Sequence, residues 1–198
     1  AVAKGKYHID LGLDVLRLND SVANMSVISP EHWREFIFPH MRDVVTELHA
    51  YSADALVYCH ICGNVLPVLE DIVATGIDCI GPLDPLGGFS PAEARSIVGD
   101  RVSLMGGVDT QTFVNGTPDQ VRTEARAAVA GGALQRGDGV GDPSESPGPR
   151  TRGRPRQEAA AAGFILGSGC VIPRTAKREN LLALRNAVEP GWQGEDSR

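Results

Sequence analysis

Short apolar runs alternate with amphipathic segments along most of this chain of 198 residues. The apolar runs lack a regular alternation of polar and apolar positions, which is typical of parallel strands that are buried on both faces. They predict strands at 7–18, 53–60, 77–83, 101–109 and 163–169.

The segments between these runs predict helices. Trp33, Ile37, Met41 and neighbouring apolar residues recur at helical spacing, and Ser90-Pro91-Ala92-Glu93 forms a capping box with proline at the first helical position. We expect helices at 30–50, 65–75, 91–98, from 118 onwards and at 176–189. Repeated strand–helix units predict one α/β domain over 1–198 with a parallel sheet, and both a barrel and an open doubly wound sheet fit.

One segment interrupts this pattern. Residues 132–161 contain a long Gly/Pro/Arg-rich stretch, and structureless loops of this length are uncommon inside compact folds. Three interpretations remain open: a flexible solvated insertion, sequence translated from a shifted reading frame, or a basic docking loop. The predicted strand–helix pattern resumes at Gly163.

Composition narrows the class of protein. The net charge of -6 and the aromatic content of 5% argue against a nucleic-acid-binding surface. No apolar run approaches the roughly 20 residues that a membrane helix needs, and no signal-peptide pattern opens the chain, so we expect a cytoplasmic protein. Four cysteines in a chain of this length do not suggest a disulfide scaffold and favour a metal site or catalysis.

Chemically reactive side chains follow the ends of the predicted strands. His60 and Cys62 follow the second strand, Asp84 the third, Asp109 the fourth and Cys170 the fifth. Barrels and open α/β sheets both place their active sites at the carboxyl ends of parallel strands. We therefore expect these side chains to meet at one edge of the sheet.

His60 and Cys62 are candidate zinc ligands because side chains two apart in an extended segment point the same way. Cys170 could supply a third ligand, and three protein ligands leave a position for substrate, as in catalytic zinc sites. The alternative is that these are ordinary buried residues, since His-x-Cys alone is a weak signal and free cysteines are usually core residues. We interpret Cys59 and Cys79 as core residues.

Four blocks of sequence carry a family resemblance. In order they are VISPEHWREFIFPHMRDVV, YCHICGNVLPVLEDIVATGIDCIGPLD, GDRVSLMGGVDTQTFVNGTPDQVRTEA and GFILGSGCVIPRTAKRENLLAL. Together they resemble the uroporphyrinogen decarboxylase superfamily, within it the corrinoid-dependent branch typified by methylcobalamin:coenzyme M methyltransferases. The resemblance implies a TIM (β/α)8 barrel, of which this chain would supply about five strands and lack the N-terminal part.

The resemblance also implies roles for particular residues. Methyltransferases of this branch carry His-x-Cys-Gly and a distant cysteine that bind zinc, which match His60, Cys62 and Cys170. We expect Gly63, the last residue of His-x-Cys-Gly, and Asn64, which follows it, to contact the cofactor. Two further residues, Asp20 and Asp109, are candidate catalytic or ligand-orienting acids, with a capping or turn role as the alternative for each.

The activity implied is transfer of a methyl group from a methyl-corrinoid (methylcobalamin) to a zinc-activated thiol, with a corrinoid protein and a small thiol as partners. One alternative is a decarboxylase acting on a tetrapyrrole carboxylate, which is disfavoured because Gly169-Cys170 stands where decarboxylases carry Gly-His-Gly. The other is an inactive truncated fragment, which the abrupt start and residues 132–161 would favour.

Overall fold

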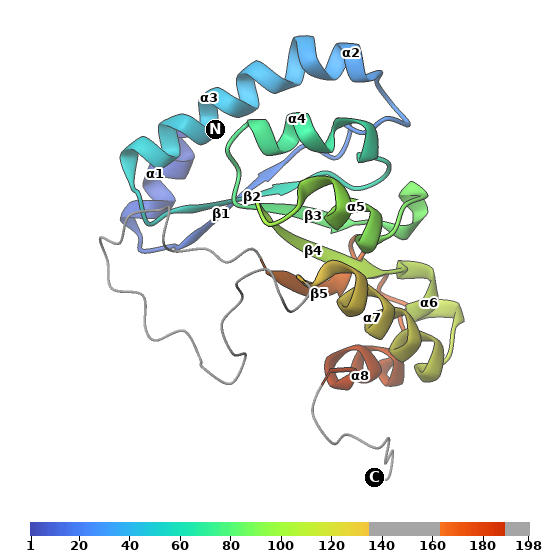
Figure 1. Cartoon of the computed structure of the whole chain (residues 1–198). Helices are drawn as coiled ribbons and strands as arrows, with labels where there is room; N and C mark the ends of the chain where they lie inside the picture. The colour runs from blue at the N-terminus through green and yellow to red at the C-terminus, as the bar shows by residue number, and fades with distance from the viewer. Residues whose placement is uncertain (135–162, 189–198) are drawn as a thin grey trace.

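A sheet of five parallel strands forms the centre of the computed structural model, which describes residues 1–134 and 163–188 (Figure 1). The strands lie side by side in sequence order, so each strand–helix unit adds the next strand at one edge. They are β1 (Val15–Asn19), β2 (Leu56–His60), β3 (Cys79–Leu83), β4 (Ser103–Val108) and β5 (Phe164–Ser168). This arrangement confirms the predicted parallel α/β fold; the predicted insertion at 132–161 lies outside the described residues from position 135 onwards.

Helices connect the strands, and the predicted caps are present. Ser90 and Glu93 form the capping box of α5, and Thr117 and Gln120 form that of α7. The helical elements are α1 (Val2–Asp10), α2 (Pro30–His32), the π-helical η1 (Trp33–Ile37), α3 (Phe38–Tyr51), η2 (Leu66–Val68), α4 (Leu69–Ala74), η3 (Pro85–Gly87), α5 (Pro91–Val98), α6 (Thr110–Asn115), α7 (Pro118–Gly132) and α8 (Arg178–Asn186). None of the helices in the described residues combines the length and apolar character needed to cross a membrane.

The prediction of a strand over 7–18 is wrong in its first half. Val2–Asp10 forms helix α1, and the strand begins only at Val15. The helix is held by tertiary contacts with α3: Lys6 Nζ lies 3.1 Å from Glu47 Oε2, and the Tyr51 hydroxyl donates to Asp10 at 2.7 Å. Such long-range contacts outweigh local strand propensity and leave no trace in the local pattern.

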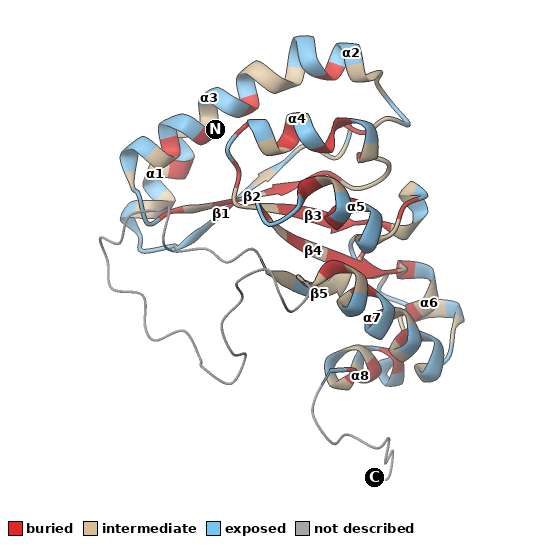
Figure 2. Cartoon of the chain, viewed as in Figure 1, coloured by how far each residue is buried: buried red, intermediate tan, exposed pale blue. Residues whose placement is uncertain are grey.

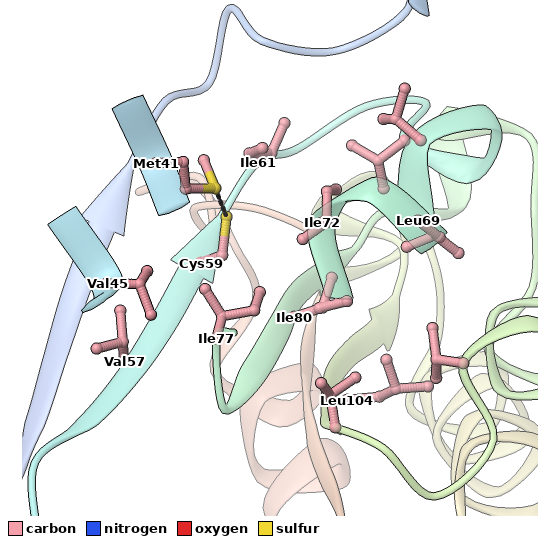
Figure 3. Close-up of a cluster of buried hydrophobic side chains, with 14 of the residues drawn as sticks. Met41, Val45, Val57, Cys59, Ile61, Leu69, Ile72, Ile77, Ile80 and Leu104 are labelled. Carbon is pink, nitrogen blue, oxygen red and sulfur yellow. Dashed lines mark hydrogen bonds between the residues drawn. The ribbon is translucent and has the colours of Figure 1, made fainter. Parts of the chain in front are cut away.

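A hydrophobic core fills the space between the sheet and the helices of one face (Figures 2 and 3). Val57 and Cys59 of β2 project into it, where the Cys59 thiol lies 3.8 Å from Met41 Sδ of α3. Cys59 is 1% exposed, which confirms the prediction that it belongs to the core. Tyr58 and His60 alternate with these residues along the strand and therefore occupy the opposite face.

A buried arginine joins several backbone segments near the amino-terminal ends of β4 and β5. Arg95 of α5 donates hydrogen bonds to the carbonyl oxygens of Gly132 at 2.8 Å, Val102 at 3.1 Å, Gly163 at 2.9 Å and Gly99 at 2.5 Å. Its guanidinium group thus holds the end of α7 beside the start of β5.

The carboxyl ends of the five strands share one edge, here called the C-terminal rim. Its strand-terminal residues are Asn19, His60, Leu83, Val108 and Ser168. The candidate residues predicted to follow the strands all lie at or just beyond this rim, as the sequence led us to expect.

Candidate metal centre

Three of the predicted site residues come together at the C-terminal rim. His60 ends β2, Cys62 lies two residues further on, and Cys170 lies just beyond the end of β5. One ligand atom from each residue lies within 4.8 Å of the other two. Ligand distances of about 2.0–2.3 Å place the ligand atoms of a tetrahedral zinc site roughly 3.3–3.8 Å apart, so the three side chains need to close in only slightly to bind one ion.

The convergence depends on the shape of the sheet, because β3 and β4 separate β2 from β5. Three strand spacings in a flat sheet would span about 14 Å. Backbone hydrogen bonds fix the two loops that bridge this span: Ile61 donates to the Gly81 carbonyl at 3.0 Å, and Gly169 donates to the Val108 carbonyl at 2.7 Å. The segment after β5 also lies against the turn after β3, where Gly169 closely approaches Asp84 and Pro85, and this path brings Cys170 to His60 and Cys62.

His60 is held in a state suited to metal binding. Its Nδ1 atom lies 3.0 Å from the Tyr58 hydroxyl, and when this nitrogen donates to the phenol oxygen, Nε2 keeps a free lone pair. Burial lowers the pKa of His60, and the Arg17 guanidinium lowers it further, so the imidazole is neutral at neutral pH. Burial raises the pKa of Tyr58, which keeps the phenol protonated.

The two cysteines are partly buried and adjacent. Burial raises the pKa of the Cys170 thiol; the Val171 backbone amide lowers it, and the neighbouring Cys62 raises it again. Without a cation Cys170 therefore favours the thiol form, whereas a bound divalent cation favours thiolates. Two thiolates and one neutral imidazole form a soft ligand set with zero net charge once zinc is bound, and leave a fourth position free.

The two predicted acids lie outside this group of three ligands. The Asp109 carboxylate accepts the backbone N–H of Gln111 at 2.8 Å and caps α6, in agreement with the alternative interpretation of this residue. Asp20 directly follows β1, and its backbone N–H donates to the His60 carbonyl at 3.1 Å. A role for either acid in ligand orientation stays a prediction.

Gly63 and Asn64 shape the loop that carries Cys62. Gly63 has a φ of 87°, a left-handed conformation that favours glycine. The side-chain oxygen of Asn64 accepts the Leu66 N–H at 3.1 Å, and the backbone carbonyl of Asn64 accepts the Met25 N–H at 2.8 Å. Their predicted contact with a cofactor is not tested by these bonds.

Sequence reasoning missed Tyr58. It is the residue two positions before His60 on the same strand face, so the alternation of β2 was the signal that could have identified it. Its ring also meets the His60 imidazole edge-on, with the ring centroids 5.9 Å apart.

Comparisons with known proteins agree with this description. Residues 2–139 match the family model of uroporphyrinogen decarboxylase (URO-D). A methylcobamide:CoM methyltransferase, MtaA of Methanosarcina barkeri, is 28% identical over 133 residues, which are 67% of this chain and 37% of that protein. A uroporphyrinogen decarboxylase of Chlorobium phaeovibrioides is 38% identical over 120 residues, which are 59% of this chain and 31% of that protein.

The fold has a counterpart among solved structures. A methyltransferase from Methanosarcina mazei superposes with a TM-score of 0.70 over 94% of this chain and 44% of that protein, at 23% identity. The five-stranded sheet therefore has the arrangement of part of a barrel of the uroporphyrinogen decarboxylase type. The matches to MtaA and to the Chlorobium decarboxylase span only 37% and 31% of those proteins. The family model covers residues 2–139, which are most of this chain, and the chain therefore belongs to the uroporphyrinogen decarboxylase family.

Proposed function

We propose that this chain carries the zinc-binding part of a methyltransferase that moves a methyl group from a methyl-corrinoid to a thiol. The carrying observation is the convergence of His60, Cys62 and Cys170, with ligand atoms within 4.8 Å of one another. Two relatives have names of matching chemistry, the methylcobamide:CoM methyltransferase above and a methylated-thiol–coenzyme M methyltransferase of Methanosarcina mazei that is 33% identical over 135 residues.

The three side chains would hold the ion and leave one position for the substrate thiol. Zinc bound there supplies Lewis acidity, which lowers the pKa of a thiol and makes a thiolate available at neutral pH. Tyr58 keeps the His60 ring oriented through Nδ1, and partial burial of the two cysteines limits the access of water to the sulfur atoms.

The overall reaction balances without a further reagent. The substrate thiol would lose its proton to solvent, its sulfur would form a bond to the methyl carbon, and the cobalt–carbon bond would break with both electrons remaining on cobalt. The corrinoid supplies the reactive methyl group, and the protein supplies orientation and charge. A corrinoid protein that docks at the C-terminal rim is the partner that this scheme requires.

A tetrapyrrole decarboxylase is the second candidate, because decarboxylases of Chlorobium species are among the relatives. A decarboxylase would give no reason for two cysteines and a histidine to meet at one point. The two functions differ in their need for metal, which makes zinc content the first measurement.

The test measures zinc per chain in the monodisperse protein by elemental mass spectrometry. We expect about one zinc in the parent, a large loss in Cys170→Ser and no loss in Cys79→Ser, a control at the start of β3. The zinc-loaded protein is then assayed with methylcobalamin and a panel of thiols. Zinc content that is unaffected by Cys170→Ser, or decarboxylation of a tetrapyrrole acid by metal-free protein, would refute the proposal.

A further inference from the structure

Asp84 is a buried acid that lies between the two ligand-bearing loops. It directly follows β3, is only 7% exposed, and begins the turn formed by η3. One loop, which carries Cys62, follows the neighbouring strand β2, and the other, which carries Cys170, follows β5. The turn that begins at Asp84 contacts both.

On the Cys62 side the contact is a hydrogen bond supported by close backbone packing. Asp84 Oδ2 accepts the backbone N–H of Gly63, the residue after Cys62, at 3.2 Å. The same turn presses Gly87 against this loop, since a methyl group on Gly87 would lie 2.6 Å from the Gly63 carbonyl oxygen. Gly87 is thus at a close approach between two backbones, which only glycine permits.

On the Cys170 side the contact is steric. A methyl group on Gly169, the residue before Cys170, would lie 2.6 Å from Pro85 Cδ and 3.1 Å from Asp84 Cα. The loop after β5 therefore rests directly on the turn after β3. The turn has one ligand-bearing loop packed against each side.

We propose that Asp84 is a positioning residue that sets the spacing between Cys62 and Cys170. Its carboxylate ties down the backbone of the Cys62 loop, and the turn it initiates supports the Cys170 loop. A capping role alone would explain the bond from the Leu86 N–H to Oδ1 at 3.0 Å, but not the bond to Gly63, which lies in another loop. The consequence for zinc binding rests on the proposed function; the spacing of the thiols does not.

The test compares Asp84→Ala and Asp84→Asn with a matched control, Asp78→Asn. Asp78 lies just before β3, and its Oδ2 accepts the Val57 backbone N–H at 2.6 Å and lies 3.0 Å from His49 Nε2, so the control neutralises a similarly bonded carboxylate at the opposite end of the strand. The side-chain amide introduced by Asp84→Asn keeps one acceptor oxygen, which can satisfy one of the two N–H donors. The asparagine variant should therefore restore part of what the alanine variant loses.

Three readouts are needed. In metal-free protein, dibromobimane bridges thiols that lie close together, and mass spectrometry identifies the Cys62–Cys170 product. In metal-loaded protein, competition with a chromophoric chelator gives the zinc Kd, and the absorption of a Co²⁺-substituted sample reports ligand geometry. We expect Asp84→Ala to slow the cross-link, weaken zinc by about 10- to 100-fold and alter the cobalt spectrum, as loss of a group that orients ligands does.

Asp84→Asn should give intermediate values, and Asp78→Asn should leave all three readouts unchanged. Gly169→Ala introduces a methyl group that would clash with Pro85, which disturbs the contact between the turn and the Cys170 loop, and it should also slow the cross-link. Unchanged cross-linking and zinc affinity in folded Asp84→Ala or Asp84→Asn would overturn the assignment. Absence of zinc from the parent would refute the proposed function instead, while the metal-free cross-link would still decide the role of Asp84.

Discussion

Replacing Arg95 with methionine removes the four hydrogen bonds that this side chain donates but keeps most of its volume. Two of the acceptors, the carbonyls of Gly132 and Val102, are bonded in buried surroundings at 2.8 and 3.1 Å. The other two bonds, to Gly99 and Gly163, are partly buried, and the Gly163 carbonyl also accepts the Leu104 N–H at 3.0 Å. The variant therefore leaves two buried carbonyls without this donor.

The magnitude follows from these bonds. A hydrogen bond to a charged group contributes about 1.5–3 kcal/mol, so the two buried bonds contribute about 3–6 kcal/mol and the partly buried ones less. Burial of the guanidinium offsets several kcal/mol of this gain and lowers the pKa of Arg95. We expect the free energy of unfolding to fall by about 2–4 kcal/mol in Arg95→Met.

Urea denaturation measures this loss, with the fluorescence of the fully buried Trp33 as a probe of the core. Arg34→Met is the control, because Arg34 makes an exposed ion pair with Asp71 at 2.9 Å and such pairs contribute little. An unfolding free energy in Arg95→Met within about 0.5 kcal/mol of the parent would show that the buried bonds do not stabilise the fold as reasoned here.

Two further predictions concern the site and the thiols. Tyr58→Phe removes the hydroxyl at His60 Nδ1 and should weaken zinc binding about 10-fold, as measured by competition with a chelator, with little change in the thermal midpoint. Equal zinc affinity in parent and variant would argue against orientation of His60 through Nδ1. Burial raises the pKa of Cys59 and Cys79 to about 12 each, so the unfolded chain ionises first as the pH rises. These thiols should not affect the stability of the fold below about pH 8.5, and the stability should fall as the pH rises towards 12. The fall should be shallower in Cys79→Ser, and identical profiles of melting temperature against pH for parent and variant would contradict this prediction.

The sequence predicted the carboxyl ends of the strands, and the meeting of His60, Cys62 and Cys170 there, because strand ends depend on local patterns. Each apolar run ends where the chain reaches the rim, and the alternation of β2 separates buried Cys59 from His60. The resemblance to a known family then linked Cys170 to the same site.

Other features depend on contacts between segments that are far apart in the sequence. Helix α1 was missed because its packing against α3 determines its structure. The contacts of Asp84 were not predictable either, since an aspartate before a turn has the same local signal whether it caps that turn or also binds a neighbouring loop. Asp109, which shares this signal, caps α6.

The three candidate ligands come from the ends of β2 and β5, which are not neighbours in the sheet. A bound metal would therefore connect two strands that share no backbone hydrogen bonds. An ion bound by His60, Cys62 and Cys170 would cross-link the chain across the two intervening strands and oppose flattening of the sheet. A ligand present at 1,000 times its Kd that binds only the folded state stabilises it by about 4 kcal/mol, a large part of the stability of an ordinary domain. Zinc availability would then govern how much of the chain is folded, and a chelator would lower its melting temperature as well as empty its site.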